Sequence, residues 1–252
     1  MTRAAARTRG HAALVAVLVA GFALSACGAS PAPVGPTGVD QLTIPTPSPD
    51  PADFGPDVDN TWFPLPPGTS WTYQRATVDG SERLVATALP ETRRIDGVET
   101  RPVRWVALRA GGGTTPLAVR WYAQDTAGNV WWFGQRLTRL GRDLDALATR
   151  SWQAGRAGAQ AGLMMAASPR MGDGYANAYA RGVVERRSTV LSLTATASVP
   201  ARTYHDAVLT RDVSRIEPIH VARSYYAPDV GLVAQQTVAT TTSELFLVRM
   251  RP

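Results

Sequence analysis

The chain contains few side chains whose types and spacing could carry out chemistry. Its one cysteine is Cys27, and two of its three histidines, His205 and His220, lie in the last fifth of the sequence. Their separation does not match His-Glu-x-x-His, His-x-His or another common spacing of metal ligands. No serine lies in a Gly-x-Ser-x-Gly or Ser-x-x-Lys motif. The sequence therefore predicts no catalytic residue, no metal site and no cofactor.

Cys27 directly follows the features of a secretory signal peptide. Residues 1–11 carry arginines, residues 12–23 are apolar, and small residues precede the cysteine. The apolar run of about 12 residues is shorter than the roughly 20 that a membrane-spanning helix needs. The stretch Leu24-Ser25-Ala26-Cys27 resembles the lipobox of bacterial lipoproteins. This resemblance implies cleavage between Ala26 and Cys27 and acylation of the Cys27 thiol with chains such as palmitate. Ordinary cleavage after Ala26, without a lipid, is the alternative.

Acylation of Cys27 predicts a protein anchored to the cell membrane, with its domain on the extracytoplasmic side. Two or three acyl chains anchor a protein stably, whereas one binds only marginally. No other cysteine remains for a disulfide or a catalytic thiol. All 26 basic residues are arginines, and loss of three in the signal peptide brings the net charge from +6 to about +3. These arginines are interspersed with acidic residues, so no nucleic-acid partner is expected.

A linker is expected between the lipidated cysteine and the domain. Residues 27–58 are rich in Pro, Gly and Ser and have few apolar side chains, which is typical of disordered chain. Four aspartates at 50, 53, 57 and 59 raise the possibility of calcium binding. Their spacing differs from that of a calcium loop and prolines interrupt it, so a solvated linker is favoured.

Residues 59–252 have the pattern of a single, mainly β domain. Asp79-Gly80 and Asp96-Gly97 favour hairpin turns between apolar runs. A segment at about 140–172 is rich in Ala, Gly, Leu and Met and is expected to be an insert of loop with one short helix near 140–150. The ten segments expected to be strands are 70–78, 83–95, 98–109, 117–124, 129–138, 182–198, 206–216, 219–227, 231–238 and 243–250. This order predicts a curved antiparallel meander that forms a half-barrel or a closed barrel.

Two stretches resemble an uncharacterised family of actinobacterial secreted lipoproteins. They are NTWFPLPPGTSWTY at 60–73 and WYAQDTAGNVWWFG at 121–134, and the likeness continues through 151–165, 169–175 and 224–233. The resemblance implies export, but it supplies no catalytic residues because no activity is assigned to such proteins. The family pattern has a glycine where this chain has Asp229. A weaker likeness, in strand pattern, is to curved-sheet envelope proteins of the lipoprotein-carrier type, whose concave face holds acyl chains.

The second stretch places a large aromatic surface around one turn. Asp125 and Gly128 are expected to form that turn, with Gly128 in the left-handed conformation and Asp125 opposite Asn129. Alternation then puts Trp121, Ala123, Trp131 and Phe133 on one face, and Tyr122, Gln124, Val130 and Trp132 on the other. Both faces are aromatic, so both are expected to be covered. One cover is the core; the other is Leu163, Met164 and Met165 of the insert, a ligand or a partner.

The aromatic residues Trp121, Tyr122, Trp131, Trp132 and Phe133 are therefore the candidate ligand or partner surface. The favoured function is a membrane-anchored envelope lipoprotein that binds a lipid or another apolar or amphipathic ligand, without catalysis, in a pocket of a few hundred cubic ångströms. A protein-interaction or scaffold lipoprotein is the alternative, and it requires an exposed aromatic patch. An envelope hydrolase is the third possibility, and it requires a cleft with carboxylates or a histidine of perturbed pKa.

Overall fold

A computed structural model describes residues 50–78, 80–109, 111–138, 150–238 and 242–252. The chain divides into two compact units, Met1–Gly35 and Pro36–Pro252. All described residues belong to the second unit, so Ala26, Cys27 and the linker up to residue 49 lie outside them. No helix within the described ranges is long and apolar enough to span a membrane.

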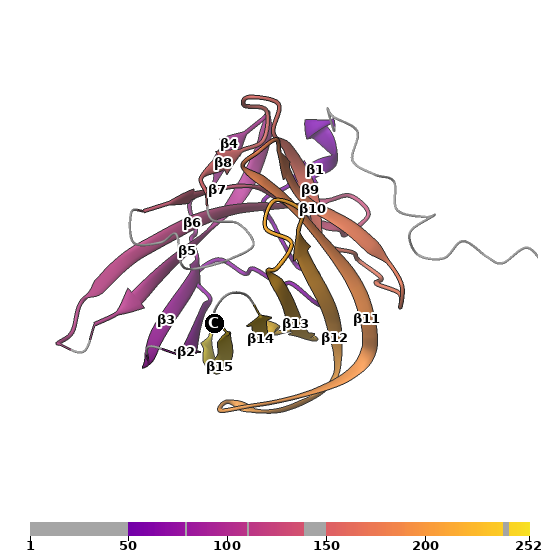
Figure 1. Ribbon diagram of the computed structural model, residues 1–252. Helices are drawn as coiled ribbons and strands as arrows, with labels where there is room; N and C mark the ends of the chain where they lie inside the picture. The colour runs from indigo at the N-terminus through magenta and orange to yellow at the C-terminus, as the bar shows by residue number, and fades with distance from the viewer. Residues whose placement is uncertain (1–49, 79, 110, 139–149, 239–241) are drawn as a thin grey trace, which may run out of the picture. The chain divides into compact units, whose positions relative to one another are not determined.

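The second unit is built almost entirely of antiparallel β-strands (Figure 1). The one helix among the described residues is a short 3₁₀ turn, η1 (Pro51–Asp53). The strands are β1 (Phe54–Gly55), β2 (Ser70–Thr77), β3 (Gly80–Ala88), β4 (Arg93–Ile95), β5 (Val98–Leu108), β6 (Thr114–Asp125), β7 (Val130–Leu137), β8 (Trp152–Gln153), β9 (Gln160–Met165), β10 (Gly174–Ala180), β11 (Val184–Val199), β12 (Arg202–Ser214), β13 (Val221–Ala227), β14 (Gly231–Val238) and β15 (Ser243–Arg251).

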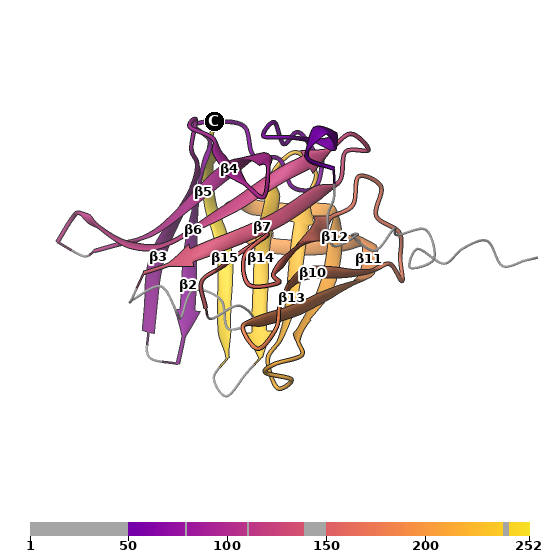
Figure 2. The same ribbon diagram turned by 90° about the horizontal axis from the view of Figure 1, so that it is seen from above.

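Twelve of these strands close into a barrel, which confirms the predicted fold class. The order around the wall is β6-β5-β3-β2-β15-β14-β13-β12-β11-β10-β9-β7, and pairing of β7 with β6 closes the ring. The short strands β1, β4 and β8 lie beside this ring, against β6, β5 and β7. Figure 2 shows β5, β6 and β7 running across β13, β14 and β15 of the opposite wall.

Each of the ten segments expected to be strands contains a strand. The turn residue Asp96 has φ 51° and Gly97 has φ 80°, as a tight hairpin turn requires. At Asp229, where the resembling family has glycine, the backbone is also left-handed, with φ 61°. An aspartate tolerates this conformation better than most residues, because its short side chain can bond locally. The turn geometry is therefore retained without the glycine.

Part of the insert expected at about 140–172 belongs to the barrel wall. Residues 139–149, which include most of the expected short helix, lie outside the described residues. From Gln160 the chain forms β9, which pairs with β7 and β10. The expectation of loop is wrong here, as is the expectation that Leu163, Met164 and Met165 cover a face of the hairpin. They extend the same sheet, with Leu163 opposite Trp131 and Met165 opposite Val130.

The end of the expected linker is also structured. Asp50 accepts a hydrogen bond from the backbone N–H of Ala52 and caps η1. Phe54 then pairs with Asp125 of β6, and Val58 is buried in the core. The expectation of disordered chain is therefore wrong for residues 50–58. Phe54 and Val58 bury apolar surface there, although the segment as a whole is rich in proline.

Candidate functional site

The segment between β1 and β2 crosses one end of the barrel. Asn60 donates hydrogen bonds to the carbonyls of Gly128 and Ala166. Thr61, one residue on, accepts one from Asp229. Phe63 lies 5.1 Å from Tyr122 of β6 and 6.1 Å from Tyr226 of β13, measured between ring centres. Because β6 and β13 are separated by five strands in either direction around the ring, Phe63 bridges opposite walls.

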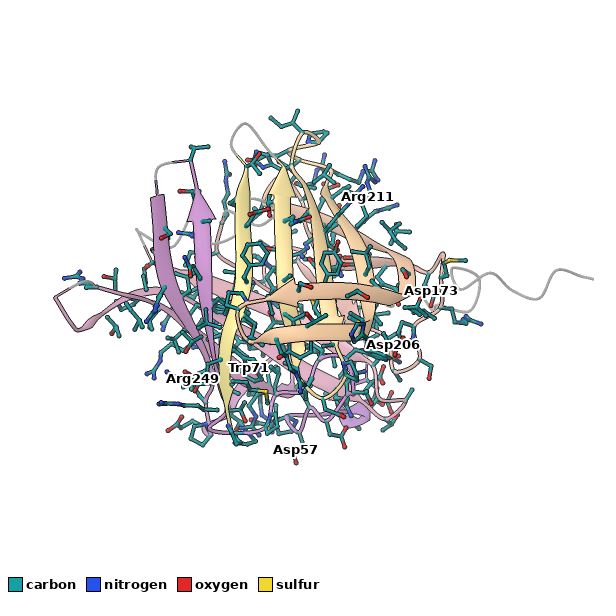
Figure 3. All side chains as sticks on the ribbon, turned by 90° about the horizontal axis from the view of Figure 1, so that it is seen from below. Asp57, Trp71, Asp173, Asp206, Arg211 and Arg249 are labelled. Atoms are coloured by element: carbon teal, nitrogen blue, oxygen red, sulfur yellow. The ribbon has the colours of Figure 1, made fainter. Side chains whose placement is uncertain are left out.

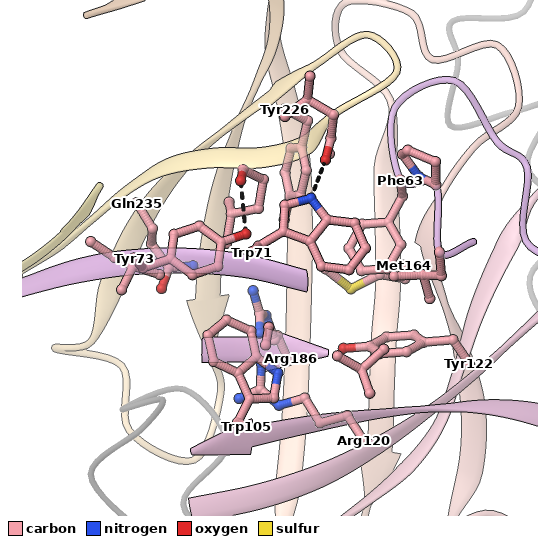
Figure 4. A pocket seen from close by; sticks show the side chains of 18 residues that line it. Phe63, Trp71, Tyr73, Trp105, Arg120, Tyr122, Met164, Arg186, Tyr226 and Gln235 are labelled. Atoms are coloured by element: carbon pink, nitrogen blue, oxygen red, sulfur yellow. Dashed lines mark hydrogen bonds between the residues drawn. The ribbon is translucent and has the colours of Figure 1, made fainter. Parts of the chain in front are cut away.

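A cavity of about 70 Å³ remains in the interior beneath Phe63 (Figure 4). Its aromatic lining comes from inward positions of four strands and from the crossing segment: Phe63, Trp71, Tyr73, Trp105, Tyr122 and Tyr226. Trp71 and Tyr73 alternate along β2, so both side chains point inward. Tyr73 stacks on Trp105 at 5.5 Å. An eight-stranded barrel already has room for a small ligand, so these large side chains fill most of a wider interior.

Two arginines reach the same cavity. Arg120 of β6 lies over the rings of Trp105 and Trp132, at 5.7 and 5.5 Å, and donates to Gln135 at 3.2 Å. Arg186 of β11 lies 5.9 Å from the Trp132 ring and is almost fully buried. Stacking on aromatic faces suits the planar guanidinium and stabilises its charge away from water.

Asp212 of β12 is the centre of a buried polar network that contacts Arg186. The Asp212 carboxylate pairs with the Arg186 guanidinium at 3.3 Å, and their side chains are 1% and 3% exposed. The same carboxylate accepts hydrogen bonds from Thr210 at 3.0 Å, from Ser224 at 2.6 Å and from Ser188. Its lone pairs are thus directed at donors within the wall, so Asp212 holds Arg186 in place.

Two aromatic residues at the cavity use their polar hydrogens within the barrel, which leaves the guanidinium groups of Arg120 and Arg186 as its charged donors. Trp71 donates to the carbonyl of Val230 at 2.8 Å, and Tyr73 donates to that of Leu232 at 2.9 Å (Figure 4). Burial raises the pKa of Tyr73 and of Tyr226 well above the ordinary value for tyrosine, so both remain protonated at neutral pH. The described residues that line the cavity include no carboxylate, imidazole or thiol. This chemistry suits binding of an acceptor or an anion.

The aromatic hairpin has the expected turn and most of the expected register. Gly128 has φ 86°, and Asp125 accepts from the backbone N–H groups of Ala127 and Asn129. Gln124, Ala123 and Tyr122 lie opposite Val130, Trp131 and Trp132. With Asp125 opposite Asn129, an unbroken register predicts that Trp121 lies opposite Phe133. This prediction is wrong, because a bulge places Trp121 opposite Gly134. A Cβ on Gly134 would lie 2.6 Å from the Trp152 carbonyl oxygen, so the bulge uses glycine.

None of the five aromatic residues proposed as a binding surface is exposed. Trp121, Tyr122, Trp131, Trp132 and Phe133 are each at most 8% accessible. Tyr122 alone lines the interior cavity, with Trp132 stacked against it at 6.4 Å. On the outer face, Phe54 covers Trp131 and Phe133 edge-on, at 5.8 and 5.3 Å. These residues therefore do not form the exposed aromatic patch that a scaffold lipoprotein requires, and Phe54 is the second cover of Trp131 and Phe133.

The two histidines among the described residues, which could take part in acid-base chemistry, lie away from the cavity. His220 pairs with Glu217 at 2.6 Å beside the turn before β13, and His205 lies 3.4 Å from Thr196 on exposed strand surface. The described residues contain no cluster of three or more possible metal ligands among His, Cys, Asp and Glu.

The sequence pattern did not reveal Arg120, Arg186 or Asp212 as interior residues. In a strand, a charged residue that alternates with apolar ones indicates an outward position, and this reading fails where the interior is polar. Trp71 and Tyr73 carried a usable signal, since aromatic residues two apart on a strand share a face.

Two solved structures are weakly similar to the chain. One, from Bacteroides fragilis NCTC 9343, is provisionally described as an exported protein with a YmcC-like fold; it is 16% identical, with a TM-score of 0.43. The other, from Parabacteroides distasonis ATCC 8503, is provisionally described as a lipoprotein; it is 11% identical, with a TM-score of 0.40. Each match covers 76% of this chain and 99% of the other.

No protein-family model matches the chain, and no curated protein matches it. The resemblance of residues 60–73 and 121–134 to actinobacterial secreted lipoproteins therefore stays a prediction.

Proposed function

We propose that the protein is an envelope lipoprotein whose barrel interior binds a small amphipathic anion. The observation that carries this proposal is the meeting of Arg120 and Arg186 in a cavity with an aromatic wall. The guanidinium groups would hold a carboxylate or another acidic head group, and the aromatic rings would contact an apolar body.

The size of the cavity limits how such a ligand binds. About 70 Å³ holds a few water molecules, whereas pockets for ligands of ordinary size measure roughly 300–1,000 Å³. A ligand with a longer apolar body would therefore have to displace Phe63, which is only partly buried and lies on a loop rather than on a strand. Phe63 and its neighbours would then act as the cover of the site.

The test is a binding series with straight-chain carboxylates from hexanoate to dodecanoate and the alcohols of equal length, followed by tryptophan fluorescence. Carboxylates should bind at least about tenfold more tightly than the alcohols, as expected for hydrogen bonds to a charged group. Arg120→Gln should remove this preference, and Phe63→Ala should favour the longer chains. The matched control is Arg104→Gln, because Arg104 is exposed on β5. Equal binding of acids and alcohols, or no effect of Arg120→Gln, would refute the proposal.

The anchor is a separate part of the proposal. If Cys27 is acylated, Cys27→Ser should move the protein from the membrane fraction to the soluble fraction, while Ser30→Ala in the linker should not. Mass spectrometry of the mature N-terminus should show an acylated Cys27. An unmodified N-terminus at Cys27 would instead indicate ordinary cleavage after Ala26.

A further inference from the structure

A second hollow lies on the outer face of the barrel, around Trp121. It is an open groove of about 470 Å³, within the range of ligand-binding pockets. Five separate parts of the chain contribute to it: β4, β6, β7, the residues around β8, and the turn between β10 and β11. Its lining residues are Arg93, Trp121, Gln135, Arg136, Ser151, Trp152, Gln153, Arg156, Ala157, Ala159, Ala180, Arg181 and Val183.

The groove has a cationic rim. Arg93, Arg136, Arg156 and Arg181 all line it, and the described lining includes no acidic residue. All four arginines are exposed, and none forms an ion pair within the described parts of the chain. Elsewhere in the domain arginines do pair with carboxylates, as in the contacts of Arg94 with Glu99 and of Arg101 with Asp57. Four arginines without an ion pair in the described parts of the chain therefore meet around one groove.

The floor of the groove is apolar and is fixed in place. Trp121 is 3% exposed, and the Arg93 guanidinium lies over its ring at 4.9 Å. Trp152 packs edge-on against Trp132 at 5.2 Å, which ties the floor to the interior core. Ala157, Ala159 and Val183 complete the apolar surface. A ligand for this site would need both an anionic group and an apolar or flat body.

We propose that this groove binds an organic phosphate. A phosphate presents three oxygens and up to two negative charges, so several guanidinium groups can bind it together, whereas one carboxylate is satisfied by a single bidentate arginine. The apolar floor between the arginines would hold the group attached to the phosphate. A soluble phosphate monoester has all three free oxygens, whereas the phosphodiester head group of an anionic phospholipid has two free oxygens and one negative charge. Arginines bind both kinds of phosphate, and the two sources are separated by experiment.

The test uses the full chain with Cys27→Ser, so that acyl chains do not contribute, and the soluble probes phenyl phosphate, inorganic phosphate and phenol. Titration calorimetry should show phenyl phosphate binding more tightly than either of the other two, with an affinity that falls as salt rises. The double variant Arg136→Gln/Arg181→Gln should weaken it by at least about tenfold. Its matched control is Arg187→Gln/Arg211→Gln, which removes the same amount of charge. These two arginines are exposed on β11 and β12 (Figure 3 labels Arg211).

A second arm measures co-sedimentation with vesicles of phosphatidylglycerol or of phosphatidylcholine. Binding to phosphatidylglycerol that the groove variant loses and the control variant keeps identifies the lipid head group as the source; phenyl phosphate binding without vesicle binding identifies a soluble ester. Equal weakening by the two double variants, or no binding of phenyl phosphate and no vesicle binding, would overturn the proposal.

Discussion

Trp131 and Trp132 are adjacent in the chain but lie on opposite sides of the barrel wall. Trp132 stacks on Tyr122 in the interior and lies beneath the guanidinium of Arg120. Trp131 faces outward, where its indole N–H donates to Asp125 at 2.8 Å and Phe54 packs on its ring. The wall is thus buried on both faces at this hairpin, by the core within and by the N-terminal segment outside.

The outer cover predicts a role for Phe54 in stability. Phe54→Ala would expose Trp131 and Phe133 and remove two edge-on aromatic contacts, each worth about 0.5–1.5 kcal/mol besides the buried area. We expect the free energy of unfolding to fall by about 2–3 kcal/mol in urea denaturation, with a red shift of tryptophan emission. Val78→Ala is the control, because Val78 is 71% exposed. An unchanged midpoint for Phe54→Ala would show that the segment contributes no cover.

Gly162, where β9 lies against β10, predicts a larger loss of stability. A Cβ on Gly162 of β9 would overlap the backbone of Asn177 and Ala176 on β10. Gly162→Ala should therefore destabilise the protein by about 3 kcal/mol or prevent folding, since backbone cannot move aside as a flexible side chain can. Gly111→Ala is the matched control, because a Cβ there meets nothing within 4 Å. Equal thermal stability of the two variants would contradict this packing.

Strands β9 and β10 could not be predicted from the sequence. The ten predicted strands carry alternating β-branched and aromatic residues with clear turn signals, and each contains a strand. The strands that join the two halves, β9 and β10, read QAGLMM and GYANAYA. Alanine, glycine and methionine are poor indicators of strand, because their place in a sheet depends on close approach of neighbouring backbones. That approach is visible only in three dimensions, at contacts such as Gly162 with Asn177.

The sequence predicted the kind of candidate site, a surface lined by aromatic residues, but it did not predict which residues line it. An aromatic binding surface was expected on the hairpin from 121 to 134, yet only Tyr122 lines the interior cavity. The other aromatic walls come from strands far away in the sequence, including those of Trp71 and Tyr226. Register alone could not show that Phe54 covers the outer face, because this residue lies in a stretch with the composition of a linker.

The interior ion pair predicts a large cost for removing its carboxylate. Asp212→Asn removes the carboxylate charge that pairs with the buried Arg186 guanidinium, which should lower the free energy of unfolding by about 3 kcal/mol. Asp206→Asn makes the same chemical change at an exposed position of β12 and should have almost no effect. The check is urea denaturation of both variants at neutral pH. A similar small change in both would show that Arg186 does not depend on Asp212.

Removal of the hydroxyl group should change the stability of the protein in opposite directions at two buried tyrosines, Tyr73 and Tyr175. Tyr73→Phe removes the hydrogen bond to the carbonyl of Leu232 and should cost about 1 kcal/mol. The Tyr175 hydroxyl is buried and has no hydrogen-bond partner among the described residues. Tyr175→Phe should therefore be neutral or stabilising by up to about 1 kcal/mol, because it removes an uncompensated polar group. Thermal unfolding of the pair tests this, and destabilisation by Tyr175→Phe would contradict it.

The buried tyrosines also predict how stability depends on alkaline pH. Burial raises the pKa of Tyr73, Tyr175 and Tyr226 above the value of about 10 that tyrosine has in an unfolded chain. Above pH 10 the unfolded chain loses protons that the folded protein keeps, so the unfolded state is favoured as pH rises. The stabilising contribution should be complete below pH 10 and decline above it, by up to about 1.4 kcal/mol per pH unit for each tyrosine.

Urea denaturation at pH 8, 9, 10 and 11 measures this decline. Tyr73→Phe should reduce the slope above pH 10, because phenylalanine has no proton to lose. Tyr179→Phe is the matched control, since Tyr179 is 40% exposed. The ultraviolet titration of the folded protein should likewise show the buried tyrosines ionising only as the chain unfolds. Equal slopes for the wild type and Tyr73→Phe would show that Tyr73 ionises alike in the folded and unfolded chains.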